Sequence, residues 1–291
     1  MKPLLKWVGG KTQIINTILD IFPDEIDNYY EPFLGGGSVL FSAIKSEKIK
    51  GRIYATDLNE NLINFYIHLQ KNCKDLIDEV EILLKCFTDI STNDIDRKPE
   101  SLQAALTSRE SYYYWIRQKY NNMPSSIKKS AMFLFLNKTC FRGLYREGPN
   151  GFNVPYGHYK NVFNFDKNHT RELSKMIKHV KFTFCDFEKT IKKANKNDFI
   201  YIDPPYVPVN SKSFVAYTAG GFNKVDHERL FKCIKESNSD MLMSNSDSDI
   251  IKNEFQDRCF KIETISCRRA INSKNPGSRA NELLVHKNPM M

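Results

Sequence analysis

Four consecutive residues, Asp203-Pro204-Pro205-Tyr206, place a carboxylate, two prolines and an aromatic ring directly after the apolar run 199–202. Because proline has no backbone N–H, the run must end as a strand at Asp203, and the carbonyl groups of the following turn lack ladder partners. The Asp203 carboxylate and the Pro204 carbonyl can accept two hydrogen bonds from one amino group, and the Tyr206 ring offers a face for stacking. We therefore expect Asp203, Pro204 and Tyr206 to be catalytic residues that hold and orient the amino group of a nucleobase.

The exocyclic amino group of adenine or cytosine is a weak nucleophile, because its nitrogen lone pair is delocalised into the ring. Acceptors on both N–H bonds direct that lone pair towards an electrophile. A sulfonium methyl group already carries positive charge, so its transfer needs no metal ion and no general base with a shifted pKa. Since Tyr206 would act through its ring face, we expect its hydroxyl group to be dispensable.

A second set of residues is typical of a nucleotide site. Glycines 35–37 end a predicted strand and precede a helical pattern, and Asp57 ends the next predicted strand. Glycines allow a ligand to approach the backbone closely, and an acid at this place accepts hydrogen bonds from ribose hydroxyls. A pyrophosphate is disfavoured, because Leu40 replaces the third glycine of G-x-G-x-x-G and the sequence has no phosphate-binding loop motif. The sequence therefore predicts S-adenosylmethionine as the ligand, and it disfavours an NAD-dependent dehydrogenase.

The elements that must position these residues follow the strand–helix–strand pattern of a parallel α/β sheet. The first strand is predicted within 28–34 and the second at 51–57, and Asp57 can cap the helix that follows. Helices such as 108–120 and 130–139 fill a segment from about residue 70 to residue 170, which ends in a loop at 143–159. Strands then resume at 180–185, 199–203, 241–244, 262–270 and 282–286, the last two as a hairpin. We expect an α/β fold that is interrupted by a mainly helical insertion.

The chain has 291 residues and a formal net charge of +9, and the positive excess lies in one segment. Residues 101–181 contain 14 Lys or Arg against 4 Asp or Glu. Aromatic residues are interleaved with these charges: Tyr112, Tyr113, Tyr114, Tyr120, Phe141 and Tyr145. A charge run is more often a solvated face, but basic and aromatic residues together serve both phosphates and bases. We expect a nucleic-acid surface in this segment.

Seven cysteines are scattered without C-x-x-C spacing, and six histidines form no pair with metal-ligand spacing. We therefore expect a reducing intracellular compartment and no structural metal. The densest apolar run, 131–136, is too short to cross a bilayer, so no membrane association is expected.

Taken together, these motifs resemble those of the Dam-type DNA adenine methyltransferases of the alpha group. The resemblance covers nearly the whole chain and rests on the stretches Lys6–Lys11, Glu31–Gly37, Asp57, Phe135–Arg146, Phe152–Gly157, Asp203–Tyr206 and Arg268–Asn272. The order of cofactor motif, recognition segment and D-P-P-Y is also the family's order. The resemblance implies a Rossmann-like S-adenosylmethionine-dependent methyltransferase sheet, with a discontinuous catalytic domain at 1–66 and 171–291 and a helical DNA-recognition domain at 67–170.

The resemblance also implies roles for individual residues. S-adenosylmethionine would be bound by Trp7, Lys11, Phe33, Gly35, Gly37, Asp57, Asp186, Phe187 and Asp203. DNA would be bound by Lys6, Phe141, Arg142, Leu144, Arg146 and Pro155. Many members read GATC through positions that match Lys6, Leu144 and Arg146, and an arginine bidentate to guanine is the commonest specific contact in the major groove. The family often has Tyr-Asn where this chain has Phe141-Arg142.

The implied activity is methyl transfer from S-adenosylmethionine to the exocyclic amino group of a flipped adenine in double-stranded DNA, within GATC. Three alternatives stay open: the same chemistry on another DNA sequence, methylation of RNA or of a protein glutamine, and a catalytically inactive DNA-binding homologue. Glutamine enzymes usually carry Asn where Asp203 stands. We expect an intracellular enzyme of the cytoplasm and nucleoid, or a viral enzyme acting in the host cell, that is monomeric on DNA. A cognate restriction endonuclease that shares the same site is the expected indirect partner.

Overall fold

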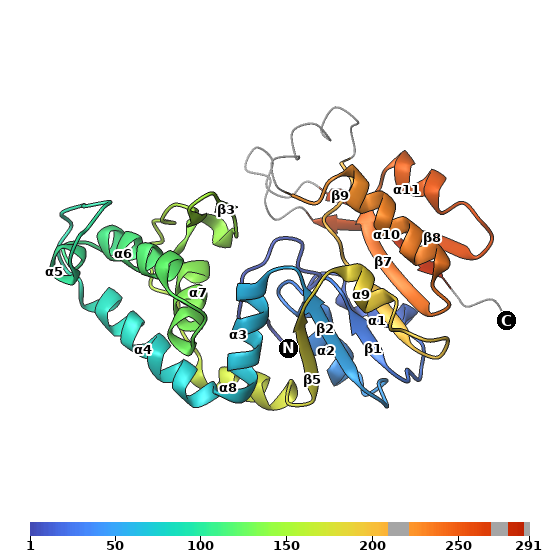
Figure 1. Ribbon diagram of the computed structural model, residues 1–291, viewed down its shortest axis with the longest axis horizontal. Helices are drawn as coiled ribbons and strands as arrows, with labels where there is room; N and C mark the ends of the chain where they lie inside the picture. The colour runs from blue at the N-terminus through green and yellow to red at the C-terminus, as the bar shows by residue number, and fades with distance from the viewer. Residues whose placement is uncertain (209–220, 269–278, 288–291) are drawn as a thin grey trace. The chain divides into compact units, whose positions relative to one another are not determined.

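The computed structural model describes residues 1–208, 221–268 and 279–287. These residues form two compact units, each built from separate segments of the chain (Figure 1). The helical unit comprises residues 1–10, 35–37 and 59–178, and the sheet unit comprises the described residues of 11–34, 38–58 and 179–291. The predicted recognition domain, 67–170, falls within the helical unit, and its role stays a prediction. Residues 269–272 of the Arg268–Asn272 motif lie outside the described residues.

The described residues of the sheet unit contain a seven-stranded sheet with the order β5-β2-β1-β6-β7-β9-β8 (Figure 1). Its strands are β1 (Tyr29–Glu31), β2 (Ile53–Asp57), β5 (Val180–Phe184), β6 (Phe199–Ile202), β7 (Asp240–Ser246), β8 (Phe260–Arg268) and β9 (Arg279–Lys287). Strand β9 runs antiparallel to both its neighbours, and all other neighbouring strands are parallel. The predicted α/β fold is therefore confirmed, as is the pairing of the last two strands.

Alternate residues of the central strand β6 pack on opposite faces of the sheet. Phe199 and Tyr201 lie against the ring of Phe22, which ends α1 (Ile15–Ile21), and α2 (Ser38–Lys45) packs beside that helix. Ile200 and Ile202 belong to the apolar core shared with α9 (Phe187–Ile191), α10 (Lys224–Glu236) and α11 (Asp249–Glu254). All four residues of β6 are buried, as expected for a parallel strand that is covered on both faces.

The strand order places a topological switch point between β1 and β6. The chain moves from β1 outwards to β2 and β5, and later from β6 outwards to β7 on the other side. In open α/β sheets, ligands bind beyond the carboxyl ends of the strands at such a point. Glu31 ends β1, Asp57 ends β2, and Asp203 directly follows β6. Because these strands are parallel, they bring the three acids to one edge of the sheet.

The helical unit is built around α7 (Ile127–Thr139), which contacts α3 (Glu60–Lys71), α4 (Cys73–Asp89) and α6 (Arg109–Asn122). Its other elements are α5 (Leu102–Ala105), the 3-10 turn η1 (Phe141–Gly143), β3 (Glu147–Gly148), β4 (Gly151–Phe152) and α8 (Lys167–Met176). Most residues of α7 are buried, so this helix is covered by its neighbours on more than one face. The predicted helices 108–120 and 130–139 are confirmed, whereas the short β3–β4 hairpin was not predicted within the loop 143–159.

Polar caps fix where the helices of this unit begin. Ser108, Ser126 and Asp166 each accept a hydrogen bond from a backbone N–H in the first turn of α6, α7 and α8. The prediction that Asp57 caps α3 was wrong. The cap is Asn59, whose Oδ1 accepts from the Leu62 N–H at 3.0 Å. A side chain two residues earlier cannot reach the first turn in the same way, so Asp57 belongs to the strand end rather than to the helix.

In the described part of the chain, none of the helices combines the length and the apolar composition needed to cross a membrane. Within the same residues, no group of three or more His, Cys, Asp or Glu side chains is placed to hold a metal ion. The seven cysteines are free thiols.

Candidate active site

The Asp203 carboxylate is held on both of its oxygens. Its Oδ2 lies 2.7 Å from the Lys11 Nζ, and its Oδ1 accepts a hydrogen bond from the Ser244 Oγ at 2.8 Å. The Lys11 side chain is only 3% exposed, whereas that of Asp203 is 21% exposed. The ion pair is therefore buried on the lysine side and open on the carboxylate side. The structure thus brings together two predicted residues, Lys11 and Asp203, and adds Ser244, which sequence reasoning missed.

A chain of hydroxyl groups from β6 and β7 supports this carboxylate. The Tyr201 hydroxyl lies 3.1 Å from the Ser244 Oγ, and both side chains are fully buried. Burial raises the pKa of Tyr201 well above its usual range, so the phenol keeps its proton. Because the Ser244 hydroxyl donates its hydrogen bond to Asp203, it accepts a hydrogen bond from the Tyr201 hydroxyl. The plane of the Asp203 carboxylate is thereby fixed by side chains of the sheet.

Tyr206 is anchored at both ends of its side chain. The Lys11 Nζ lies 5.0 Å from the centre of its ring, within cation–π distance, so Lys11 lies over one ring face. Its hydroxyl donates to the Glu282 Oε2 of β9 at 2.7 Å. Burial, together with the negative charges of Asp203 and Glu282, raises the pKa of Tyr206 well above its usual range. The sequence alone predicts no role for this hydroxyl, and Glu282 is not among the predicted site residues.

The backbone after the two prolines is tied to the end of β7. The Val207 N–H donates to the Asn245 Oδ1 at 3.0 Å, and the Ser246 Oγ donates to the Val207 carbonyl at 2.5 Å. Pro204 is buried, and among the described residues no hydrogen bond reaches its carbonyl. Within the described residues the Pro204 carbonyl, one residue after Asp203, therefore has no hydrogen-bond donor, and its role as an acceptor stays a prediction.

Glu31 and Asp57 add two further acids at the same edge of the sheet. Burial raises the pKa of Glu31 to about 8; the hydrogen bond from the Tyr29 hydroxyl, at 2.6 Å, opposes this rise, and the charges of Asp203 and Asp57 add to it. At neutral pH, Glu31 is therefore mostly protonated. A neutral Glu31 avoids a third negative charge beside Asp57 and Asp203.

The predicted cofactor residues Phe33, Asp186 and Phe187 form one group in the sheet unit. The rings of Phe33 and Phe187 are stacked, with their centroids 5.5 Å apart. Asp186 caps α9, and its Oδ1 accepts from the Arg229 guanidinium at 2.9 Å. Arg229 also lies over the Phe187 ring, 4.9 Å from its centre. The structure therefore brings these three predicted residues together, and it adds Arg229 as the side chain that stiffens them.

In the helical unit, Trp7 packs on the predicted glycines. A Cβ at Gly35 would lie 2.8 Å from the Trp7 Cδ1, and one at Gly36 would lie 2.9 Å from the Trp7 Cβ. Gly35 also has a φ of 48°, and its carbonyl accepts from the Tyr66 hydroxyl at 3.3 Å. Gly37 shares the positive φ, at 73°. The glycines are thus required by their own backbone and by the tryptophan beside them.

Lys6 is fastened to the predicted recognition loop through Asn137 of α7. The Asn137 Oδ1 accepts from the Lys6 N–H at 2.8 Å, and its Nδ2 donates to the Lys6 carbonyl at 2.7 Å and to the Gly143 carbonyl at 3.5 Å. Gly143 has a φ of 66°, and a Cβ there would lie 2.5 Å from the Lys6 Cβ. Sequence reasoning missed Asn137, although a buried amide within an apolar helix is a signal that could have revealed it.

The remaining predicted DNA-binding residues lie on the same loop. The Phe141 N–H donates to the Pro155 carbonyl at 2.8 Å, and the Leu144 N–H donates to the Phe141 carbonyl at 3.2 Å. The Phe141 side chain is 44% exposed, and Arg142 has a left-handed backbone with a φ of 56°. All six predicted residues, Lys6, Phe141, Arg142, Leu144, Arg146 and Pro155, are therefore gathered in one part of the helical unit.

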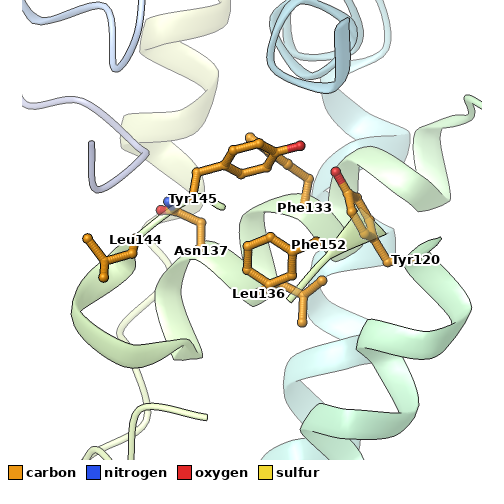
Figure 2. A pocket seen from close by; sticks show the side chains of 7 residues that line it. All are labelled: Tyr120, Phe133, Leu136, Asn137, Leu144, Tyr145 and Phe152. Atoms are coloured by element: carbon orange, nitrogen blue, oxygen red, sulfur yellow. The ribbon is translucent and has the colours of Figure 1, made fainter. Parts of the chain in front are cut away.

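The Arg146 side chain is hydrogen-bonded to Asn153, which is not among the predicted site residues. Its Nε donates to the Asn153 Oδ1 at 2.7 Å, and the Asn153 N–H donates back to the Arg146 carbonyl at 3.1 Å. The loop rests on an aromatic pocket, shown in Figure 2, that is lined by Tyr120, Phe133, Leu136, Asn137, Leu144, Tyr145 and Phe152. Trp7 stacks on Tyr145 of this lining, with their centroids 5.7 Å apart. The loop thus packs on this aromatic lining, and Arg146 within it is exposed.

Comparison with known proteins gives concordant matches. Residues 7–271 match the family model of the D12 class N6 adenine-specific DNA methyltransferases. The chain is 36% identical over 288 residues to a type II methyltransferase of Methanocaldococcus jannaschii, covering 94% of each chain. It is 30% identical to a type II methyltransferase of Lactococcus lactis (98% and 95% covered) and 30% identical to the DNA adenine methylase of Haemophilus influenzae (96% and 90% covered).

Proposed function

The chain belongs to the D12 class of N6 adenine-specific DNA methyltransferases, and we propose that the adenine it methylates lies within the duplex sequence GATC. It is a site-specific DNA methyltransferase, and S-adenosylmethionine is its methyl donor. The observation that supports the catalytic assignment is the Asp203 carboxylate, which Lys11 and Ser244 hold on its two oxygens. The next residue, Pro204, has a carbonyl that accepts no hydrogen bond from the described residues.

We assign the orientation of the target amino group to Asp203 and Pro204. The two N–H bonds of the adenine amino group donate to the Asp203 carboxylate and to the Pro204 carbonyl, which directs the nitrogen lone pair away from both acceptors. Because Lys11 covers one face of the Tyr206 ring, the flipped base stacks on the other face. The rigid diproline turn keeps all three groups in place, so little ordering entropy is lost when the base arrives.

The donor set at the sheet edge fits S-adenosylmethionine, which when bound supplies an electrophilic methyl group on a sulfonium. We assign Asp57, at the end of β2, to the ribose hydroxyls, and the stacked Phe33 and Phe187 rings, with Asp186 next to Phe187, to the adenine ring. Lys11 and Asp203 complete this set in the sheet unit. By family resemblance we assign Trp7, Gly35 and Gly37 to the same ligand.

The GATC proposal rests on the recognition loop. Asn153 binds the Nε of Arg146, and a bidentate guanine contact uses the terminal amino groups of an arginine. Lys6 and Leu144 match the other base-reading positions of GATC enzymes, and Phe141 is exposed enough to insert into a base stack. Arg142 and Pro155 complete the set of DNA contacts. The alternative, another DNA sequence, is favoured by the Phe141-Arg142 pair that replaces the usual Tyr-Asn.

The family assignment bears on partners and setting. DNA is the substrate of this family, and we propose that this enzyme acts on it as a duplex. We further propose that the enzyme acts as a monomer on DNA inside the cell. Because two relatives are named as type II methyltransferases, we propose a cognate restriction endonuclease that acts on the same sequence.

The target sequence is tested by methylating a mixed-sequence plasmid and mapping every methylated adenine. We expect methylation at GATC adenines and resistance of those sites to an endonuclease that cleaves only unmethylated GATC. Methylated adenines in a different common sequence would refute GATC and leave the enzyme class intact. The absence of any methyl transfer by the folded protein would favour an inactive DNA-binding homologue.

The base-reading role of Arg146 is tested on the same plasmid. Arg146→Ala should cost roughly 1–3 kcal/mol at one guanine and relax the preference at that position. Arg171→Ala is a control, because Arg171 is exposed on α8 and bonds to Asn168. If Arg146→Ala lowers methylation at all sites without changing their ranking, Arg146 contacts phosphate and does not read a base.

A further inference from the structure

Glu282 stands out as an acid placed at the active-site edge by a strand that carries no part of the D-P-P-Y motif. It lies in β9, where it pairs with Ser246 of β7 on one side and with Ile265 of β8 on the other. Its Oε2 receives the Tyr206 hydroxyl at 2.7 Å, across 76 residues of sequence. This hydrogen bond joins the C-terminal hairpin to the catalytic segment.

The stacking function of Tyr206 depends on the orientation of its ring. The two prolines restrict the backbone before Tyr206, and the hydrogen bonds of Val207 fix the backbone after it. Neither constraint fixes rotation about the side-chain bonds. Lys11 lies over one ring face, but a cation above a ring does not prevent the ring from shifting within its own plane as the side-chain torsions change. The bond from the hydroxyl to Glu282 supplies the missing constraint at the far end of the ring.

A purely structural role for Glu282 explains less. Glutamate is depleted in β-strands, and Asp203, Asp57 and Glu31 already supply acids at the neighbouring strand ends. Adding another carboxylate there increases electrostatic repulsion. A charged acceptor makes a stronger hydrogen bond to a phenol than a neutral acceptor does, which suits a ring that must hold its position while a base stacks against it.

We propose that Glu282 is a positioning residue for methyl transfer, which holds the Tyr206 ring in the orientation that receives the flipped adenine. The inference rests on the proposed roles of Asp203 and Tyr206. It reverses the expectation from sequence that the Tyr206 hydroxyl is dispensable. Glu282 itself does not touch the substrate; it acts through Tyr206.

The test uses Glu282→Ala, Glu282→Gln, Tyr206→Phe and the double variant Tyr206→Phe/Glu282→Ala in the full-length protein. The rate of transfer of a labelled methyl group to plasmid DNA is measured under single-turnover conditions, together with the Kd for S-adenosylmethionine and the thermal midpoint. Glu282→Ala and Tyr206→Phe should each slow transfer roughly 10- to 100-fold, since each removes the same charge-assisted hydrogen bond. The Kd for S-adenosylmethionine should stay unchanged.

Two results discriminate positioning from general stability. Because the two side chains share one interaction, the double variant should be no slower than the slower single variant. Glu282→Gln keeps an acceptor oxygen but makes a weaker, neutral hydrogen bond, so its rate should lie between that of Glu282→Ala and that of the wild type. Glu263→Ala is the matched control: it removes an acid from the same hairpin, but Glu263 pairs with Lys261 and should not affect the rate.

The proposal is overturned if the double variant multiplies the two single losses. It is also overturned if Glu282→Gln restores the thermal midpoint without raising the rate above that of Glu282→Ala, or if Glu282→Ala transfers at the wild-type rate. Asp203→Ala separates this inference from the proposed active site. If Asp203→Ala transfers methyl groups at a near-wild-type rate, the active-site assignment fails, whatever the Glu282 variants do.

Discussion

At the scale of single residues, the pairing of Lys11 with Asp203 links catalysis to stability. The Lys11 side chain is almost fully buried, and its Nζ forms an ion pair with the Asp203 carboxylate at 2.7 Å. Removing one member of a buried ion pair leaves the other charge uncompensated, which costs much more than removing both. The residue that we propose to orient the substrate therefore also pairs with a buried lysine.

Asp203→Ala should abolish methyl transfer and also lower the free energy of unfolding by roughly 3 kcal/mol. The double variant Lys11→Met/Asp203→Ala should regain much of that stability, because no unpaired charge stays buried, while activity stays absent. Urea unfolding measures the first quantity and labelled-methyl transfer the second. Equal stability of the single and double variants would show that Lys11 does not depend on Asp203 for its charge compensation.

Glu31 predicts a pH dependence of stability. Its pKa is raised from an ordinary 4.5 to about 8 in the folded protein, mainly by burial. Between these values the unfolded chain has lost a proton that the folded protein keeps, so this group's contribution to stability falls as pH rises from about 4.5 to 8. Above that window the contribution is constant.

Glu31→Gln should therefore become more stable relative to the wild type as the pH rises through this window. The amide cannot ionise, yet its oxygen can still accept the Tyr29 hydroxyl. Urea unfolding at a series of pH values from about 4 to 9, which brackets this window, measures the difference. A constant difference across the series would mean that Glu31 titrates normally in the folded protein.

At the scale of elements, the end of β7 organises the catalytic segment. Three consecutive side chains of this strand hold it: Ser244 binds the Asp203 carboxylate, Asn245 binds the Val207 N–H, and Ser246 binds the Val207 carbonyl. The backbone of these three residues is held by the ladder with β9, and the ladder with β6 ends one residue earlier, at Met243. The D-P-P-Y turn is thus attached to the sheet at both ends.

Ser244→Ala should slow methyl transfer by roughly 10-fold and lower stability by roughly 1–3 kcal/mol, since it frees one carboxylate oxygen and leaves the buried Tyr201 hydroxyl without its acceptor. Tyr201→Phe is the comparison, because it removes the Tyr201 hydroxyl and keeps the hydrogen bond from Ser244 to Asp203. Its effect on the transfer rate should be clearly smaller. Equal rate losses in the two variants would indicate that Ser244 supports the fold and does not aim Asp203.

The elements also show what sequence could predict. The strands that end in acids, the helices 108–120 and 130–139 and the C-terminal hairpin follow local patterns, and the structure has them. Asp203 and Tyr206 could be chosen because their chemistry is visible within four residues. Glu282 and Asn137 could not, because their roles depend on packing that joins them to Tyr206 and Lys6 across 76 and 131 residues. The β3–β4 hairpin could not be predicted, because two-residue strands are too short to show a period-2 pattern of apolar residues.

At the scale of the whole molecule, charge is distributed unevenly along the chain. The segment 101–181 carries the entire positive excess, and most of it falls in the helical unit, whereas the rest of the chain is close to neutral. The salt dependence of DNA binding should depend on particular lysines if a local basic surface binds DNA, and only on the number of charges if net charge governs binding. Counterion release depends on the phosphates that a surface actually neutralises, not on the charge of distant parts.

Binding of DNA should therefore weaken steeply with salt, and the dependence should belong to this segment. Replacing Lys128, Lys129 and Lys138 with Ala should lower the slope of log affinity against log salt by roughly 0.9 for each phosphate that the surface no longer neutralises. The control replaces Lys224, Lys232 and Lys252, which changes the net charge equally but removes exposed lysines that pair with neighbouring acids in the sheet unit. Fluorescence anisotropy of a labelled duplex at several salt concentrations gives both slopes. The control should keep the wild-type slope, because its lysines contact no phosphate. If both triple variants lower the slope equally, net charge alone governs binding and the basic segment is an ordinary solvated face.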